Sequence, residues 1–170
     1  MLEENIVYQQ LKEYLQQHNW IILGGEPPGG TNHIPIIEVR DSLNLEKGSK
    51  KIDLVAFKSS FFLLLELKRS YSYSDISKLN AMIKHPSGRE AFLNALLAKG
   101  LLKSNNIIID YQQYIVSSHY LIKAVGYNAS TKYPPEDFIT FLVYASFVRP
   151  SFGKQISNQV KALFTDLIHF

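Results

Sequence analysis

The sequence KIDLVAFKSSFFLLLELK, residues 51–68, contains two strongly apolar runs separated by a pair of serines. Apolar runs rich in β-branched and aromatic residues, with small polar residues between them, are typical of two strands joined by a tight turn. Three charged residues stand within these runs, namely Asp53, Glu66 and Lys68. The stretch therefore predicts a β-hairpin that carries polar groups where burial is expected.

A turn at Ser59-Ser60 determines which residues of the hairpin lie opposite each other. Symmetric pairing about this turn places Asp53 directly opposite Glu66, where Cβ atoms are roughly 4.5 to 5.5 Å apart. Side chains along a strand alternate between the two faces, so Lys68 lies on the same face as Glu66. We therefore expect the three charged groups to gather at one end of one face.

The other face of this hairpin is wholly apolar. It consists of Ile52, Leu54, Ala56, Leu63, Leu65 and Leu67. Apart from the charged cluster, the first face is apolar as well. Strands that are apolar on both faces are covered on both sides, so these two are expected at the centre of a sheet.

The segments around the hairpin predict an α/β fold. They are a helix over 2–18, a strand over 34–40, two helices between 75 and 103, strands over 114–127 and 138–147, and a helix over 154–169. Because helices and strands are mixed along the chain, we expect one domain over residues 1–170. Its architecture should be three layers, with helices flanking a mixed central β-sheet.

Composition excludes several classes of protein. The chain has 170 residues, of which 46% are hydrophobic and 19% charged, as in an ordinary globular domain. It contains no cysteine, which excludes disulfides, thiol nucleophiles and cysteine zinc sites. No apolar run approaches the roughly 18 residues of a membrane span, and the N-terminus lacks a signal-peptide pattern. We therefore expect a cytoplasmic protein with no membrane partner.

Two carboxylates that face each other need a nearby cation. At a partly buried position they repel, and one takes up a proton unless a cation lies between them. Mg²⁺ prefers oxygen ligands and is usually held by one or two carboxylates together with phosphate oxygens of a substrate. We therefore expect Asp53 and Glu66 to hold Mg²⁺ (or Mn²⁺) in a phosphodiester hydrolase, with Lys68 assisting the attack of water. The alternative interpretation is a structural ion pair between Lys68 and the acids.

The spacing of these residues matches a known pattern. Asp53, twelve intervening residues and then Glu66-Leu67-Lys68 resemble the motif of the PD-(D/E)XK nuclease superfamily. The resemblance implies a restriction-endonuclease-like core, with these residues on a hairpin and a catalytic role for all three charged ones. The proline that names the motif is replaced by Ile52.

The N-terminal segment extends this resemblance. LEENIV at residues 2–7 is similar to the first helix of archaeal-type Holliday junction resolvases, which implies Glu3, or else Glu4, as a further catalytic and metal-binding acid. The alternative interpretation is that both acids complement the positive end of the helix dipole. The resemblance covers roughly residues 1–70.

The resemblance implies a metal-dependent DNA endonuclease. The formal charge of +3 and a pI near 9.0 permit a polyanionic partner. The basic residues expected to contact phosphates are Lys51, Lys58, Arg69 and Lys78. Restriction, repair and junction cleavage are not distinguished, and cleavage of both DNA strands would imply a homodimer. The alternative function is a non-cleaving nucleic-acid-binding module, or a subunit, with the same fold.

Overall fold

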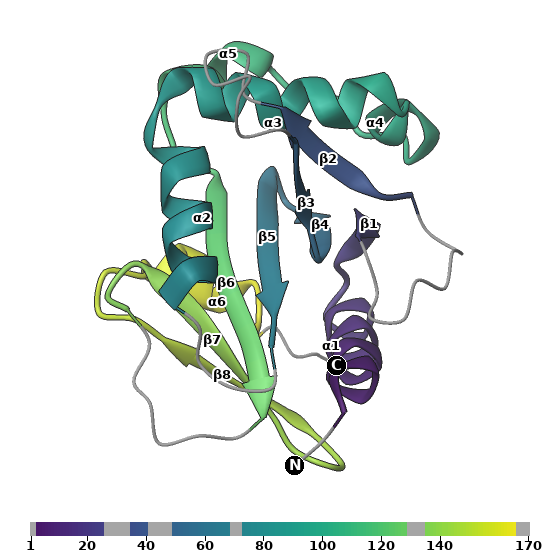
Figure 1. The fold of residues 1–170 in the computed structure, drawn as a ribbon, viewed down its shortest axis with the longest axis vertical. Coiled ribbons are helices and arrows are strands. Elements are labelled where there is room, and N and C mark those ends of the chain that lie inside the picture. The colour runs from purple at the N-terminus through teal and green to yellow at the C-terminus, as the bar shows by residue number, and fades with distance from the viewer. Residues whose placement is uncertain (1–2, 26–34, 41–48, 69–72, 129–134, 166–170) are drawn as a thin grey trace.

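The main feature of the structure, a computed structural model, is a six-stranded sheet in the order β1-β4-β5-β6-β7-β8 (Figure 1). The structure describes residues 3–25, 35–40, 49–68, 73–128 and 135–165. The strands are β1 (Ile21–Gly25), β4 (Leu54–Lys58), β5 (Phe61–Leu67), β6 (Leu121–Asn128), β7 (Phe138–Val143) and β8 (Val148–Phe152). Strands β5, β6 and β7 are mutually parallel, and the other neighbours are antiparallel. The predicted mixed sheet is confirmed.

Helices cover both faces of this sheet and complete three layers. Side chains of α1 (Glu4–Gln17) and α6 (Asn158–Ala162) pack on one face. The other face is covered by α2 (Tyr73–Lys84), α3 (Pro86–Ala98), α4 (Leu101–Ser104) and α5 (Tyr111–Val116). No helix of the described residues is both long enough and apolar enough to cross a membrane.

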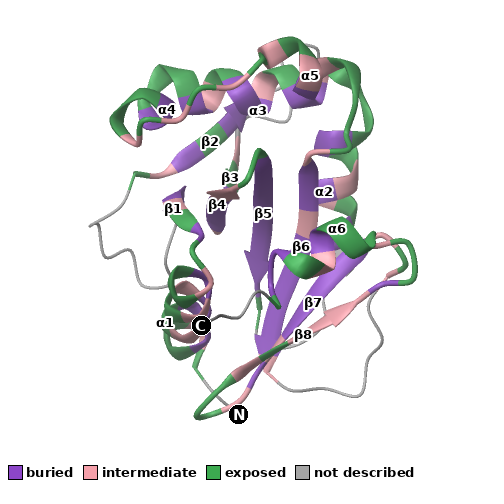
Figure 2. Ribbon diagram, turned by 180° about the vertical axis from the view of Figure 1, so that it is seen from behind, coloured by how far each residue is buried: buried purple, intermediate pink, exposed green. Residues whose placement is uncertain are grey.

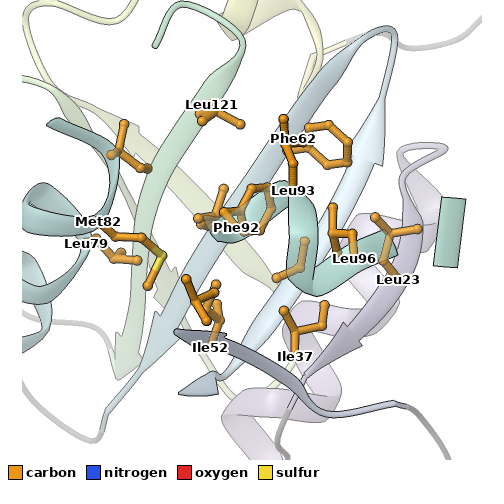
Figure 3. Packing of buried hydrophobic residues seen from close by; sticks show 14 of the residues in the cluster. Leu23, Ile37, Ile52, Phe62, Leu79, Met82, Phe92, Leu93, Leu96 and Leu121 are labelled. Atoms are coloured by element: carbon orange, nitrogen blue, oxygen red, sulfur yellow. The ribbon is translucent and has the colours of Figure 1, made fainter. Parts of the chain in front are cut away.

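The hairpin of β4 and β5 forms the centre of the sheet, as its two apolar faces predict. Every residue of β5 is buried, as the colour of this strand in Figure 2 shows. Leu63 and Leu65 point into the core beneath α1, whereas Phe62 and Leu64 point into the core beneath α2 and α3. Figure 3 shows this second core, in which Phe92 of α3 packs with Phe62.

The predicted register of the hairpin is confirmed from Leu54 to the turn, whereas the expected pair of Asp53 with Glu66 lies outside the strand ladder. Leu54 pairs with Leu65, and the remaining pairs continue symmetrically to the turn. Ser59 and Ser60 both have positive φ, at 49° and 73°. Two consecutive left-handed residues give a two-residue hairpin turn whose twist matches that of the flanking strands.

The first predicted strand of the hairpin is divided at Asp53, where the chain bends. Before the bend, β3 (Ser49–Ile52) pairs with β2 (Ile37–Arg40) in a separate two-stranded sheet. The strand expected over 34–40 therefore lies outside the central sheet. Its place beside β4 is taken by β1, an unpredicted strand whose short apolar run directly precedes a glycine- and proline-rich loop.

The close contact between β1 and the bend requires a glycine. A Cβ atom on Gly25 would lie 2.1 Å from the carbonyl oxygen of Asp53, far inside van der Waals contact. The absence of a side chain at this position lets β1 pair with β4 up to Leu54. Gly25 therefore helps to position the backbone of Asp53.

Several predicted boundaries in the second half of the chain are wrong. The strand expected over 114–127 begins only at Leu121, because 111–116 forms α5 and the ring of Tyr114 is buried in the core. The second predicted helix is interrupted at Gly100, which has a positive φ of 64°. The strand expected over 138–147 ends at Val143, and β8 follows it as an unpredicted strand. Short apolar runs do not by themselves distinguish a buried helical turn from a strand.

Within the described part of the terminal helix expected over 154–169, which ends at residue 165, the helical segment is α6. The side chain of Ser157 accepts a hydrogen bond from the backbone of Val160 and begins this helix. Residues 166–170 lie outside the described part of the chain.

Candidate functional site

Asp53 is held at the bend between β3 and β4. Its Oδ2 atom accepts a hydrogen bond of 2.8 Å from the backbone N–H of Leu67, at the end of β5. The carboxylate thus satisfies a strand-end donor at a point where β4 no longer provides a paired carbonyl. This bond fixes the Asp53 side chain beside the last residues of β5, on the neighbouring central strand.

Glu66 is the buried member of the site. It is the penultimate residue of β5, faces α2 and is 2% exposed. Its Oε1 atom forms an ion pair with the ammonium group of Lys78 on α2. The same ammonium group donates a hydrogen bond to the backbone carbonyl of Lys51 on β3. Lys78 therefore links the helix to the end of β5 and to the strand before the bend.

The acid pair is close enough to change the ionisation of Glu66. Burial raises the pKa of Glu66 to about 9, and a hydrogen bond with the Asp53 carboxyl and the charge of that group act in the same direction. The ammonium of Lys78 opposes these effects and lowers the pKa. The surroundings of Glu66 therefore favour its protonated form when no further cation is present. This agrees with the expectation that two facing carboxylates require a cation or a proton.

The free energy of unfolding should fall as pH rises between the two pKa values of Glu66. The ordinary pKa of this carboxyl is 4.5, whereas in the folded protein it is about 9. Between these values the folded protein holds a proton that the unfolded chain has released. The stabilisation is therefore complete below pH 4.5 and decreases toward pH 9, by up to about 1.4 kcal/mol per pH unit. Urea denaturation in EDTA across this range measures the slope.

Two variants assign this slope to its source. Glu66→Gln keeps the shape of the side chain and removes its ionisation, so its stability should depend less steeply on pH than that of the wild type. Glu13→Gln removes an exposed carboxylate on α1 and serves as the matched control. A slope that is equal in Glu66→Gln and in the wild type would show that another group is responsible.

Glu3, the third expected metal ligand, lies at the start of α1. It is exposed and precedes α1, where its carbonyl accepts hydrogen bonds from the backbone of Ile6 and Val7. The helix α1 packs on the face of the sheet opposite to that of Glu66. In the described part of the chain, no group of three or more histidine, aspartate or glutamate side chains could hold a metal ion. The structure thus joins Asp53 to Glu66 without Glu3.

Lys78, and not Lys68, contacts Glu66. Lys68 follows β5 directly and is exposed, and its backbone N–H donates to the carbonyl of Gly126. The contact with Glu66 that was expected of Lys68 is made by Lys78, which had been assigned to phosphate binding. The helical phase of α2 contained a signal for this, because Lys78 lies between the buried residues Ile76 and Leu79.

The other basic residues expected to contact phosphates have different surroundings. The ammonium of Lys58 donates to the carbonyls of His18 and Leu163, at 2.7 and 2.9 Å, and so joins the C-terminal end of α1 to the chain after α6. Lys51 is exposed on β3. Arg69 lies outside the described residues. Lys51 and Lys68 are therefore exposed, and each lies two positions along the chain from one member of the acid pair.

Asp53 and Glu66 form an acid pair where the C-terminal end of β5 lies beside the start of β4. The ammonium group of Lys78 contacts Glu66. Two carboxylates suffice as protein ligands for Mg²⁺, which commonly completes its coordination with water and substrate oxygens. The residues present therefore fit a magnesium ion. No protein-family model, curated protein or solved structure matches this chain in comparisons with known proteins.

Proposed function

We propose that the protein is a metal-dependent DNA endonuclease in which Asp53 and Glu66 hold Mg²⁺ or Mn²⁺. The observation that supports this proposal is that the carboxylate of Asp53, at the bend before β4, lies beside the buried carboxyl of Glu66 on β5, whose pKa is raised by burial. An acid pair in such a place is costly, since its charges are poorly solvated and repel each other. A divalent cation between the carboxylates would compensate both negative charges.

The residues around the pair have distinct roles in this proposal. The hydrogen bond from Leu67 orients Asp53, and the surrounding apolar core keeps bulk water away from Glu66. A bound Mg²⁺ would polarise a phosphate oxygen and make a water molecule more acidic. Lys68 is exposed beside the pair and stabilises the negative charge that develops on the phosphate. Lys78 holds the Glu66 side chain in position.

A second candidate function is a non-cleaving nucleic-acid-binding module with the same fold. The contacts that favour it are those that satisfy the acids without a metal. Lys78 pairs with Glu66, and Asp53 accepts the bond from Leu67. Under this function the acid pair only joins α2 to the central hairpin, and DNA binding is independent of divalent cations.

Cleavage assays with defined DNA substrates separate these functions. The purified chain is incubated with duplex, single-stranded and branched DNA in Mg²⁺, Mn²⁺, Ca²⁺ or EDTA. We expect cleavage with Mg²⁺ or Mn²⁺ and none with EDTA. DNA binding without cleavage under every metal condition would favour the non-cleaving module. The absence of both binding and cleavage would reject both functions.

Alanine variants of the two lysines should differ in what they change, namely the cleavage rate for Lys68 and the free energy of unfolding for Lys78. Lys68→Ala is expected to slow cleavage by roughly 10²-fold, since it removes a charged group beside the reacting phosphate. It should leave stability almost unchanged, because the side chain is exposed. Lys78→Ala leaves buried Glu66 without its ion-pair partner, so we expect a loss of about 1–3 kcal/mol in the free energy of unfolding. Cleavage rates and urea denaturation of both variants measure these effects.

A further inference from the structure

The turn between β7 and β8 presents a stacked pair of aromatic rings. The rings of Tyr144 and Phe147 have centroids 4.3 Å apart and planes inclined by 12°. Tyr144 is half-buried, whereas Phe147 is 52% exposed. The pair therefore offers an aromatic surface to solvent, backed by a second ring.

The position of this turn is fixed by hydrogen bonds. The backbone N–H of Tyr144 donates to the carbonyl of Phe147 at 2.9 Å. From α1, the side-chain amide of Gln10 donates to the carbonyl of Ala145 at 2.8 Å. The first bond closes the turn and the second connects it to α1, so the aromatic pair is already ordered before any ligand binds.

The aromatic pair lies at the same edge of the sheet as the acid pair. Strands β5, β6 and β7 are parallel, so their C-terminal ends meet at one edge, and Figure 1 shows the β7–β8 turn beyond the ends of β5 and β6. Glu66 pairs with Val125 of β6, and Val125 pairs with Thr140 of β7. Tyr144 follows Thr140 by four residues. Standard sheet spacings then separate Glu66 from Tyr144 by about 10 Å across the strands and about 13 Å along them.

A positive charge accompanies the rings on this hairpin. Arg149 is exposed on β8 and pairs with Leu142, two positions beyond the pair of Thr140 with Ser151. Because side chains alternate along a strand, Arg149 projects from the same face of the sheet as Glu66. The edge therefore combines the acid pair, an arginine and an exposed aromatic face.

We propose that Tyr144, Phe147 and Arg149 bind an unpaired nucleotide of the DNA strand whose backbone reaches the acid pair. This inference rests on the proposed function and names its substrate class, which is DNA with single-stranded nucleotides near the cleaved phosphate. An exposed ring stacks on the face of an unpaired base, and an arginine contacts the adjoining phosphate. In a duplex the base faces are covered by neighbouring pairs, so Phe147 discriminates in favour of single strands.

Fluorescence anisotropy in EDTA tests this inference without cleavage. The probes are a labelled single-stranded oligonucleotide and the blunt duplex of the same sequence. Phe147→Ala and Phe147→Leu should each raise the dissociation constant for the single strand by roughly 5- to 100-fold. Phe147→Trp keeps an aromatic ring at this position and should keep the dissociation constant of the wild type. Duplex affinity should change less than about twofold. Ile108→Ala, which truncates an apolar side chain that is 97% exposed, is the matched control.

Arg149→Gln provides a second and independent measurement. It should weaken binding of the single strand and reduce the dependence of log K on log salt by about 0.7, the value for one phosphate contact. A salt dependence equal to that of the wild type would reject the phosphate contact of Arg149.

Three results would overturn the stacking of a base on Phe147. They are wild-type affinity in Phe147→Ala, retained affinity in Phe147→Leu, and no single-strand binding by the wild type. Circular dichroism confirms that each variant is folded. If Phe147→Ala cleaves DNA and binds the single strand as tightly as the wild type, base stacking on Phe147 is rejected and the endonuclease function is retained. If single-strand binding depends on Phe147 but no metal supports cleavage, base stacking on Phe147 is retained and the endonuclease function is rejected.

Discussion

Asp53→Asn is expected to slow Mg²⁺-dependent DNA cleavage by roughly a thousandfold. The substitution removes one of the two negative charges that would hold the metal, and a bound metal contributes several kcal/mol to charge stabilisation in the transition state. The asparagine oxygen can still accept the hydrogen bond from Leu67, so the bend between β3 and β4 should persist. The measurement is the single-turnover cleavage rate at saturating protein.

The control for this variant is a chemically identical change elsewhere. Asp110 accepts a hydrogen bond from the backbone of Gln112 at the start of α5, and asparagine caps a helix equally well. Asp110→Asn should therefore cleave like the wild type. Asp53→Asn should still bind DNA in EDTA, because it removes a negative charge near the polyanion. Cleavage by Asp53→Asn at the wild-type rate would refute the assignment of Asp53 as a metal ligand.

Arg89→Met should lower the free energy of unfolding by about 3–5 kcal/mol, because several carbonyls lose hydrogen bonds from a charged group, each worth roughly 1.5–3 kcal/mol. Arg89 is 5% exposed on α3. Its guanidinium donates to the carbonyls of Ile83 and Lys84 at the end of α2, and of Tyr114 and Ile115 near the end of α5. The carbonyls at a helix C-terminus carry partial negative charge and lack partners within the helix. Arg89 thus joins two helix ends, and its loss leaves them unsatisfied.

Two further variants define the cause of this destabilisation. Lys84→Met removes the same charge from an exposed position in the last turn of α2, and its effect should stay below about 1 kcal/mol. Arg89→Lys keeps the charge but has a single donor group, so its stability should lie between those of Arg89→Met and the wild type. Urea denaturation at constant pH compares all four proteins. Equal stability of Arg89→Met and Lys84→Met would contradict the role given to Arg89.

The hairpin shows how far local sequence determines structure. The two serines specify a two-residue turn, and this turn fixes the register of β4 against β5. This register places Asp53, at the bend before β4, next to the end of β5 that carries Glu66. Each step depends on residues within a few positions of the turn, so the acid pair could be predicted before the rest of the fold was known.

The neighbours of the hairpin depended on contacts between distant segments. The edge of β4 could have been covered either by 34–40 or by the shorter run at 21–25, and both are apolar. Gly25 decides in favour of β1, since it allows a backbone approach to Asp53 that a side chain would prevent. Tyr114 likewise belongs to a helix because its ring fills the core and its hydroxyl reaches the carbonyl of Ser60. Neither contact is encoded in the periodicity of its own segment.

The sequence by itself determined a central apolar hairpin with Asp53 and Glu66 near the same end, because turn length and strand register are local properties. Only the tertiary structure decided which lysine accompanies them. Lysine is long and flexible, so its partner depends on which helix packs over the strand rather than on spacing along the chain. Packing of α2 brings Lys78 to Glu66 and leaves Lys68 exposed at the end of β5.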